Sequence, residues 1–95
     1  MSKYDAEFLI TVKRKFADPS RGIKTFADKS QKTDIEADSE QEALDKAFDY
    51  AVMECQQITG VTPNIDKPTR VCYVIYENGS SVEYSDFTVT KKEDQ

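Results

Sequence analysis

One amphipathic segment, residues 38–60, constrains the fold more than any other part of the chain. Its apolar side chains recur at helical spacing. Ser39 followed by Glu42 is a capping box, in which the hydroxyl and the carboxylate each satisfy a backbone N–H group that the first helical turn leaves unpaired. Gly60 is placed to end the helix in the left-handed conformation. The sequence therefore predicts one helix over about residues 40–58, with an apolar face that a second layer must cover.

Segments with strand character lie on both sides of this helix. Residues 6–16 alternate between apolar and polar side chains, as a half-buried strand does. Two later apolar segments meet at Asn78-Gly79, which is the strongest short hairpin signal. Residues 23–37, which would pair with the first strand, show only a weak pattern. We expect this second strand in two pieces or with a slack, polar middle. We expect strands over about residues 5–16, 23–37 in part, 70–77 and 81–90, a loop over 61–69 and a tail over 91–95.

The element order is therefore ββαββ, an α+β fold in which a four-stranded antiparallel sheet carries one amphipathic helix on one face. A chain of 95 residues, of which 38% are hydrophobic, fits a single domain over residues 1–95. One helix covers one face of the sheet. The other face is solvated, covered by a second copy, or used for binding.

The last predicted strand contains two apolar pairs that are out of step. Val82 and Tyr84 occupy even positions, whereas Phe87 and Val89 occupy odd positions. Alternate side chains of a strand point to opposite faces, so the pairs share a face only if the chain slips by one residue. We expect a β-bulge at Ser85-Asp86, a usual device at a sheet edge.

Composition weighs against several classes of function. No apolar run is long enough for a membrane helix, and the amino terminus lacks the apolar segment of a signal peptide, so a cytoplasmic location is expected. The chain has no histidine and three isolated glycines, which disfavours metal sites, acid–base catalysis and a Gly-rich phosphate loop. Cys55 and Cys72 are expected to be buried, reduced thiols. We expect no enzymatic activity, no cofactor and no metal.

Charge is distributed unevenly along the chain. Residues 1–32 hold eight Lys or Arg and four acids, whereas residues 33–66 hold nine acids and one lysine. Acids recur along one predicted helix face, preceded by two more in the adjoining strand, which gives the set Asp34, Glu36, Asp38, Glu42, Asp45 and Asp49. Two interpretations stay open. The row is either a solvated face, with Glu42 reaching Lys46, or a partner-binding surface that loosely resembles a nucleic-acid backbone.

Two further surfaces are candidates for binding. The segment over residues 71–76 is apolar on both sides, which indicates either a screened central strand or an interface on the sheet. That sheet surface would comprise Leu9, Tyr73, Tyr76 and Tyr84. Cations gather in the first hairpin, where they either balance the acidic helix or contact nucleic acid, although the sequence pI of about 4.7 is low for such a module. The residues for nucleic-acid contact are Lys13, Arg14, Lys15, Arg21 and Lys24.

The helix start "ADSEQEALDKAFDYA" between strands, the closing hairpin "VCYVIYENGSSVEYSDFTV" and the acidic row together resemble small inhibitor proteins encoded by bacteriophages, such as anti-CRISPR and other anti-defence or host-takeover proteins. The resemblance is one of architecture and spans the whole chain. It implies a non-enzymatic binder that blocks a protein or ribonucleoprotein complex in the host cytoplasm. The basic first hairpin departs from uniformly acidic DNA mimics.

The favoured hypothesis is thus a phage-type inhibitor acting through the acidic helix face and exposed sheet tyrosines. One alternative is a small nucleic-acid-binding module that uses the basic hairpin. Another is a structural or assembly protein that forms a homodimer through the uncovered sheet face.

Overall fold

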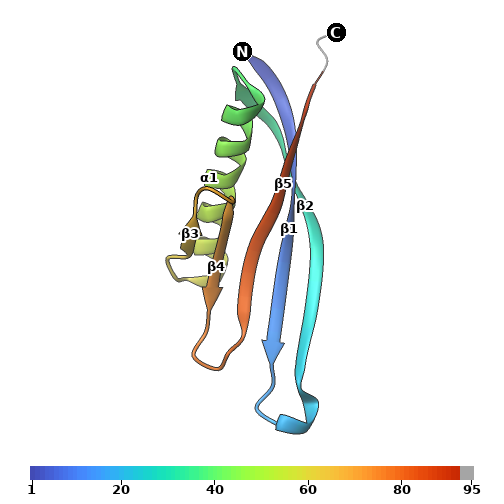
Figure 1. The fold of residues 1–95 in the computed structure, drawn as a ribbon, viewed down its shortest axis with the longest axis vertical. Helices are drawn as coiled ribbons and strands as arrows, with labels where there is room; N and C mark the ends of the chain where they lie inside the picture. Colours follow the sequence, from blue (N-terminus) through green and yellow to red (C-terminus); the bar gives the residue numbers. More distant parts are fainter. Residues whose placement is uncertain (93–95) are drawn as a thin grey trace.

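The fold is one antiparallel sheet with one helix packed on one of its faces (Figure 1). The structure is a computed structural model, and it describes residues 1–92. The predicted α+β class is confirmed, but the sheet has five strands in the spatial order β2-β1-β5-β4-β3. The strands are β1 Ser2–Lys15, β2 Ile23–Ala37, β3 Asn64–Asp66, β4 Val71–Ile75 and β5 Ser81–Lys91. The helix is α1, Glu40–Thr59.

The fifth strand lies where the sequence predicts only a loop. β3 pairs with Val71, Cys72 and Tyr73 of β4 in an antiparallel ladder. It has three residues, too few to display the alternation by which a strand is recognised. The element order is therefore β-β-α-β-β-β.

The second strand is also longer than expected. β2 runs without a break over 15 residues, so of the two expected forms the strand in two pieces is wrong, and the middle is polar and exposed. Its polar middle stays extended because β1 pairs with it along almost its whole length. The irregularity that disturbs its pattern is a bulge at Asp34, where φ is +60° and the register with β1 shifts. Only Ile35 and Ala37, which follow the bulge, are buried.

The helix begins and ends as the sequence predicts. The Ser39 hydroxyl accepts a hydrogen bond from the backbone N–H of Glu42 at 3.1 Å. Gly60 has a left-handed φ of +72°, and its N–H donates to the Gln56 carbonyl at 2.8 Å. The Glu42 carboxylate does not complete the capping box but pairs with Lys46 one turn later, at 3.1 Å.

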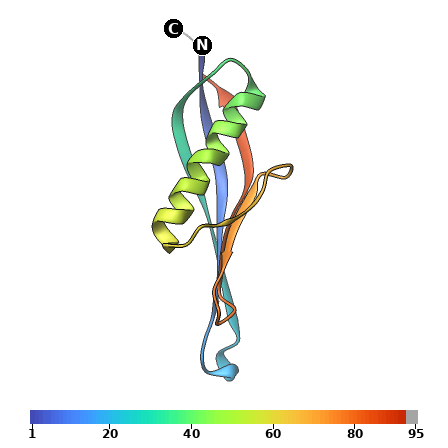
Figure 2. The same cartoon turned by 90° about the vertical axis from the view of Figure 1, so that its left-hand side faces the viewer.

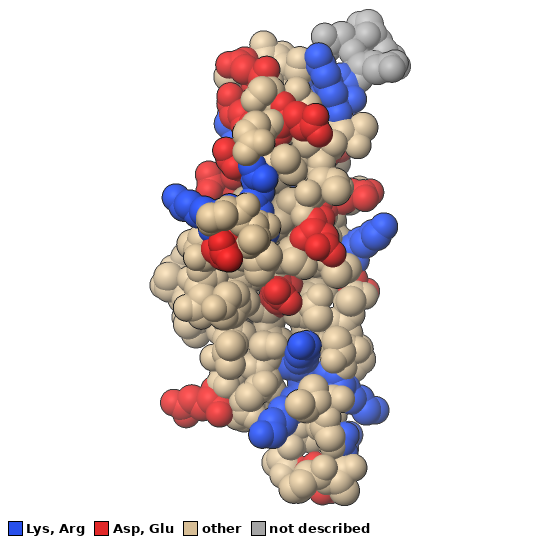
Figure 3. Space-filling view, viewed as in Figure 1, with Lys and Arg blue, Asp and Glu red and all other residues tan. Residues whose placement is uncertain are grey.

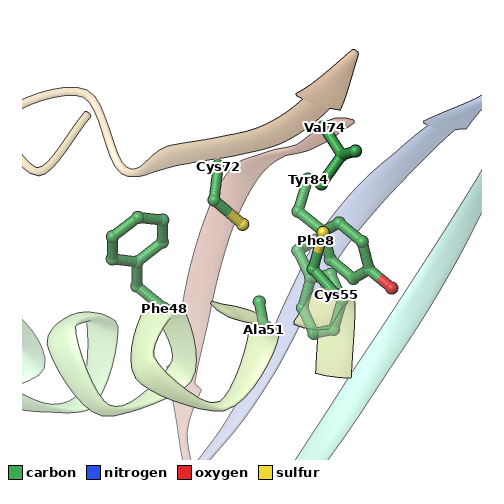
Figure 4. Close-up of a cluster of buried hydrophobic side chains, with 7 residues drawn as sticks. All are labelled: Phe8, Phe48, Ala51, Cys55, Cys72, Val74 and Tyr84. Carbon is green, nitrogen blue, oxygen red and sulfur yellow. The ribbon is translucent and has the colours of Figure 1, made fainter. Parts of the chain in front are cut away.

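The core lies between α1 and the sheet in two adjoining clusters that share contacts with Phe87. In the larger one, the Phe8 ring stacks on Tyr84 and Phe87 with centroid distances of 5.8 and 5.1 Å. Figure 4 shows side chains from α1, β1, β4 and β5 converging there. The larger cluster consists of Phe8, Phe48, Ala51, Cys55, Cys72, Val74 and Tyr84. The smaller consists of Tyr4, Ala6, Ile35, Ala37, Ala43 and Ala47.

The predicted bulge in β5 is confirmed. Between the pairs Glu7–Thr88 and Leu9–Ser85, one residue of β1 lies opposite two of β5, and Asp86 has φ of +56°. As a result the two out-of-step pairs of β5 pack beneath the same helix. The strand is central rather than at an edge, because the edges are β2 and β3.

The molecule is elongated, with extents of 55 × 22 × 21 Å. Figure 2 shows that α1 lies across one face of the sheet, here called the covered face, and that the β1–β2 hairpin continues beyond the end of the helix. The opposite side is called the open face. The segment 13–29, called the distal hairpin below, forms the far end of the molecule and includes the exposed side chains of Ile23 and Phe26.

Candidate binding surfaces

The distal hairpin gathers cations on both faces of two paired strands. Even-numbered residues of β1 such as Phe8 face the helix, so Arg14, with Lys24 opposite it, lies on the covered face. Lys13 and Lys15 lie on the open face. The segment holds two acids and six cations, the latter being Lys13, Arg14, Lys15, Arg21, Lys24 and Lys29. Figure 3 shows a group of Lys and Arg atoms toward this end of the molecule, with others spread over the rest of the view.

The tip of this hairpin is ordered by its own polar and aromatic contacts. Asp18 caps the short 3-10 helix Pro19–Arg21 by accepting from the Ser20 N–H at 3.0 Å and the Ser20 hydroxyl at 2.8 Å. These hydrogen bonds lower the pKa of Asp18. The guanidinium carbons of Arg14 and Arg21 lie 5.4 and 4.0 Å from the centroid of the Phe16 ring. Both cations are therefore held on an aromatic surface while their donors stay available to a ligand.

None of the six cations forms a salt bridge with another residue of the described segment 1–92. The salt bridges of that segment involve Lys46, Arg70 and Lys92, which lie outside the distal hairpin. The positive charge of the hairpin is thus not neutralised by local pairing.

The acidic row differs, because much of it is paired within the molecule. Arg70 donates to Asp45 at 3.0 Å, and Lys46 pairs with Glu42. Lys92 donates to the Asp34 carboxylate at 2.6 Å, and this hydrogen bond lowers the pKa of Asp34. Of the two interpretations left open by the sequence, the pairing of Glu42 with Lys46 belongs to the solvated face. Lys46 lies one helical turn after its partner Glu42, whereas Arg70 and Lys92 are brought to the row by the fold.

Three members of the row form no salt bridge within residues 1–92: Glu36, Asp38 and Asp49. All three side chains are exposed. Asp49 lies beside Lys67 in a hollow that Asp45 and Phe48 also line. What remains of the predicted acidic surface is therefore smaller than the sequence indicates, and it is shared between β2, the turn before α1, and α1.

The four predicted sheet-face residues do not form one surface. Tyr84 is 1% exposed and lies on the covered face in the core, so its assignment to an exposed surface is wrong. The bulge at Asp86 lets both apolar pairs of β5 face inward. Leu9 and Tyr73 are half-buried on the open face, where they lie opposite Ser85 and Glu83 of β5 respectively. Tyr76 is exposed in the turn that follows β4.

Among the hollows of the open face, two lie beside residues of the predicted sheet surface. One, of about 420 Å³, is lined by residues that include Leu9, Lys29 and Asp86. The other, of about 380 Å³, is lined by residues that include Tyr73 and Ile75. Ile75 is 64% exposed, and its place two residues after Tyr73 on the same strand was the signal that could have added it to the predicted surface.

Buried groups with reactive atoms are held in unreactive states. Burial raises the pKa of Cys55, and raises that of Cys72 to about 12, so both thiols are protonated near neutral pH. Burial, together with the nearby Glu54 carboxylate, raises the pKa of Tyr84. Within residues 1–92, no three His, Cys, Asp or Glu side chains gather in an arrangement that could hold a metal ion.

Comparison of the chain with protein-family models, with curated proteins and with solved structures finds no match. Among residues 1–92, no helix combines the length and apolar character that crossing a membrane requires. Function must therefore be argued from the surfaces themselves.

Proposed function

We propose that this is a non-enzymatic binding protein that contacts nucleic acid through the distal hairpin. The proposal rests on the six cations of the distal hairpin, none of which forms a salt bridge within residues 1–92. Lys and Arg side chains that contact phosphates release counterions, and this supplies most of the affinity of non-specific nucleic-acid binding.

The net charge of −5 does not oppose this proposal, because the acidic row lies far from the cations of the distal hairpin. Lys24 and Asp34 lie ten residues apart on one strand, which at the rise of a β-strand is about 33 Å. The Debye length at physiological ionic strength is about 8 Å. A phosphate group at the hairpin is therefore screened from the helix acids and is attracted by the nearby cations.

Exposed aromatic and arginine side chains favour single strands as the ligand. Phe26 is 54% exposed on the same face as Arg14, and Phe16 carries two guanidinium groups. Bases stack on aromatic rings and on arginine planes without needing sequence-specific hydrogen bonds. The proposed ligand is single-stranded nucleic acid, bound with little sequence preference.

The test is fluorescence anisotropy with labelled single-stranded oligonucleotides over a salt series. Lys13→Glu combined with Lys15→Glu should weaken binding at least about tenfold and reduce the slope of log affinity against log salt by about one for each lysine. Lys3→Glu combined with Lys91→Glu makes the same charge change at the other end of the molecule and should have a smaller effect. Equal losses in the two double variants would overturn the proposal.

A second candidate is the inhibitor that the architecture resembles, which would block a host protein complex through its acidic surface. The three members of the acidic row that form no salt bridge within residues 1–92 support it, namely Glu36, Asp38 and Asp49. Asp34, Glu42 and Asp45 are paired with cations of the same chain. The acidic surface available to a partner therefore carries less negative charge than the six predicted acids would supply.

A tagged pull-down from bacterial lysate, with and without nuclease, separates the two candidates. Asp38→Lys with Asp49→Lys is the suitable variant, since Asp45 has a structural partner in Arg70. Capture of one protein complex that survives nuclease and is lost in this variant would support the inhibitor. Capture that requires intact nucleic acid, and is lost in the Lys13→Glu, Lys15→Glu variant, would support the hairpin as the binding element.

A further inference from the structure

The two edges of the sheet differ greatly in length. β3 closes one edge with three residues, whereas β2 forms the other edge with 15. A long edge strand presents a row of unpaired backbone N–H and C=O groups that another strand can pair with. Every side chain from Ile23 to Lys29 is exposed, and Figure 1 shows this part of β2 beyond the end of α1.

The hydrogen bonds of the first hairpin identify which backbone groups face this open edge. The Phe16 N–H donates to the Gly22 carbonyl, while the Lys15 N–H is directed the other way, to the Ser80 hydroxyl at 3.0 Å. Antiparallel ladders alternate between hydrogen-bonded and non-hydrogen-bonded pairs. Carried along β2, this alternation turns the N–H and C=O groups of Ile23, Thr25, Ala27 and Lys29 toward the open edge.

We propose that this edge pairs with β2 of a second copy of the chain, around a two-fold axis that passes through Phe26 perpendicular to the sheet. In this register Thr25 lies opposite Ala27 of the second copy, and Ile23 lies opposite Lys29 of the second copy. The backbone groups that face the open edge then bond to each other across the axis, twice over by symmetry.

The side chains between these bonded pairs are self-complementary in the same register. Lys24 lies opposite Asp28 of the second copy, and the two Phe26 rings face each other. Both contacts occur at non-hydrogen-bonded positions, where cross-strand side chains are closest. Opposite charges and aromatic pairs directly across a ladder are stabilising. The contact covers the side of Phe26 that faces the second copy, in a side chain that is 54% exposed in the single chain, and leaves the outward side of the ring on the covered face.

Neighbouring registers lack this complementarity. An axis through Ala27 places Phe26 opposite Asp28, an aromatic ring against a carboxylate. An axis through Asp28 places the two Asp28 carboxylates together and sets Lys24 opposite Lys32 of the second copy, so like charges meet. Residues 23–29 are complementary to an antiparallel copy of themselves. For this reason we propose a second copy of the chain as the partner, and not an unrelated peptide.

The dimer would join two five-stranded sheets into one continuous sheet with both helices on the same side. The two distal hairpins would then lie side by side at its centre. Dimer formation requires no ligand, so it is tested separately from nucleic-acid binding and stands or fails independently of it.

Cysteine cross-linking tests the position of the axis. Phe26→Cys should form a disulfide-linked dimer under mild oxidation, because facing residues at a non-hydrogen-bonded position have Cα atoms close enough for a disulfide. Ile23→Cys is the matched control on the same strand, with 61% exposure in the native residue. Its two copies would lie six residues apart along the ladder, about 20 Å, and should not link. Equal linking of both variants would overturn the register.

Sedimentation over a concentration series tests the charge pairs. Asp28→Lys should raise the dimer dissociation constant at least about tenfold, because symmetry makes the repulsive Lys–Lys contact twice. Lys24→Asp added to Asp28→Lys exchanges the partners and should restore the affinity. Asp66→Lys, at the β3 edge, should leave it unchanged. A monomer at every concentration up to the millimolar range, or no recovery in the exchanged variant, would overturn the proposal.

Discussion

The same two strands, β1 and β2, run through two halves of the molecule that are built differently. Near the helix their side chains enter a core, where Ala6, Phe8 and Ala37 are at most 1% exposed. In the distal hairpin no residue from Arg21 to Lys29 is even half-buried. Side-chain burial specifies the structure near the helix. In the distal hairpin the structure is specified by strand pairing that continues from the first half. The hairpin side chains are therefore free for binding.

The sharpest contrast between the halves should be in thiol reactivity. Cys55 and Cys72 are fully buried between α1 and the sheet, and burial raises the pKa of both. Disulfide-exchange reagents should therefore modify them at least about 10³-fold more slowly in the folded than in the unfolded protein. A cysteine introduced as Ile23→Cys should react at nearly the unfolded rate. Fast modification of the native thiols would show that the helix does not stay packed on the sheet.

Truncation of an aromatic ring should separate the halves next most clearly. Phe8→Ala removes a ring that stacks on two others and should lower the free energy of unfolding by about 3–5 kcal/mol. Phe26→Ala, measured by the same urea denaturation at low protein concentration, should change it by less than about 0.5 kcal/mol. Comparable losses would mean that the distal hairpin contributes to a core.

Removal of a capping hydroxyl is expected to have a smaller effect. Ser39→Ala leaves the Glu42 N–H without its partner and should cost about 1 kcal/mol in thermal or urea unfolding. Ser20→Ala, in the exposed turn of the distal hairpin, should cost less than about 0.5 kcal/mol. If Ser20→Ala lowered the free energy of unfolding more than Ser39→Ala, the distal hairpin would contribute more to the stability of the fold than the helix end does.

The smallest effect concerns the ion pair between Asp34 and Lys92. The hydrogen bond from Lys92 lowers the pKa of Asp34 in the folded protein. The resulting stabilisation is therefore complete above the unfolded pKa of the carboxyl group and is lost as pH falls through the lower, folded pKa. Lys92→Met should move the Asp34 midpoint up toward its usual value in a carboxyl NMR titration. An unchanged midpoint would show that the pair does not form in solution.

Several elements were predictable because their signals are local. Ser39 and Gly60 marked both ends of α1, and Asn78-Gly79 marked the turn before β5. The out-of-step apolar pairs of β5 indicated its bulge to within one residue. Prediction failed where pairing with a neighbour overrides local pattern, as in β2, whose polar residues stay extended along β1, and in β3, which is too short to show a period.

The candidate surfaces show the same division. The cations of the distal hairpin could be found from sequence, since consecutive charged residues in a hairpin are exposed whatever the fold. The acidic row was only partly correct, because Arg70 and Lys92 reach it from distant parts of the chain. Tyr84 was misplaced because its face depends on which side of the sheet the helix covers.

The sequence by itself determined one helix between antiparallel strands, its caps, the β5 bulge and the segregation of charge along the chain, because each depends on residues close together in sequence. The tertiary structure alone decided that β5 is central, that Tyr84 is buried, which acids are neutralised, and that β2 is left as a long edge beyond the helix. These depend on which distant segments pair, and strand pairing is set by the packing of the whole sheet against α1.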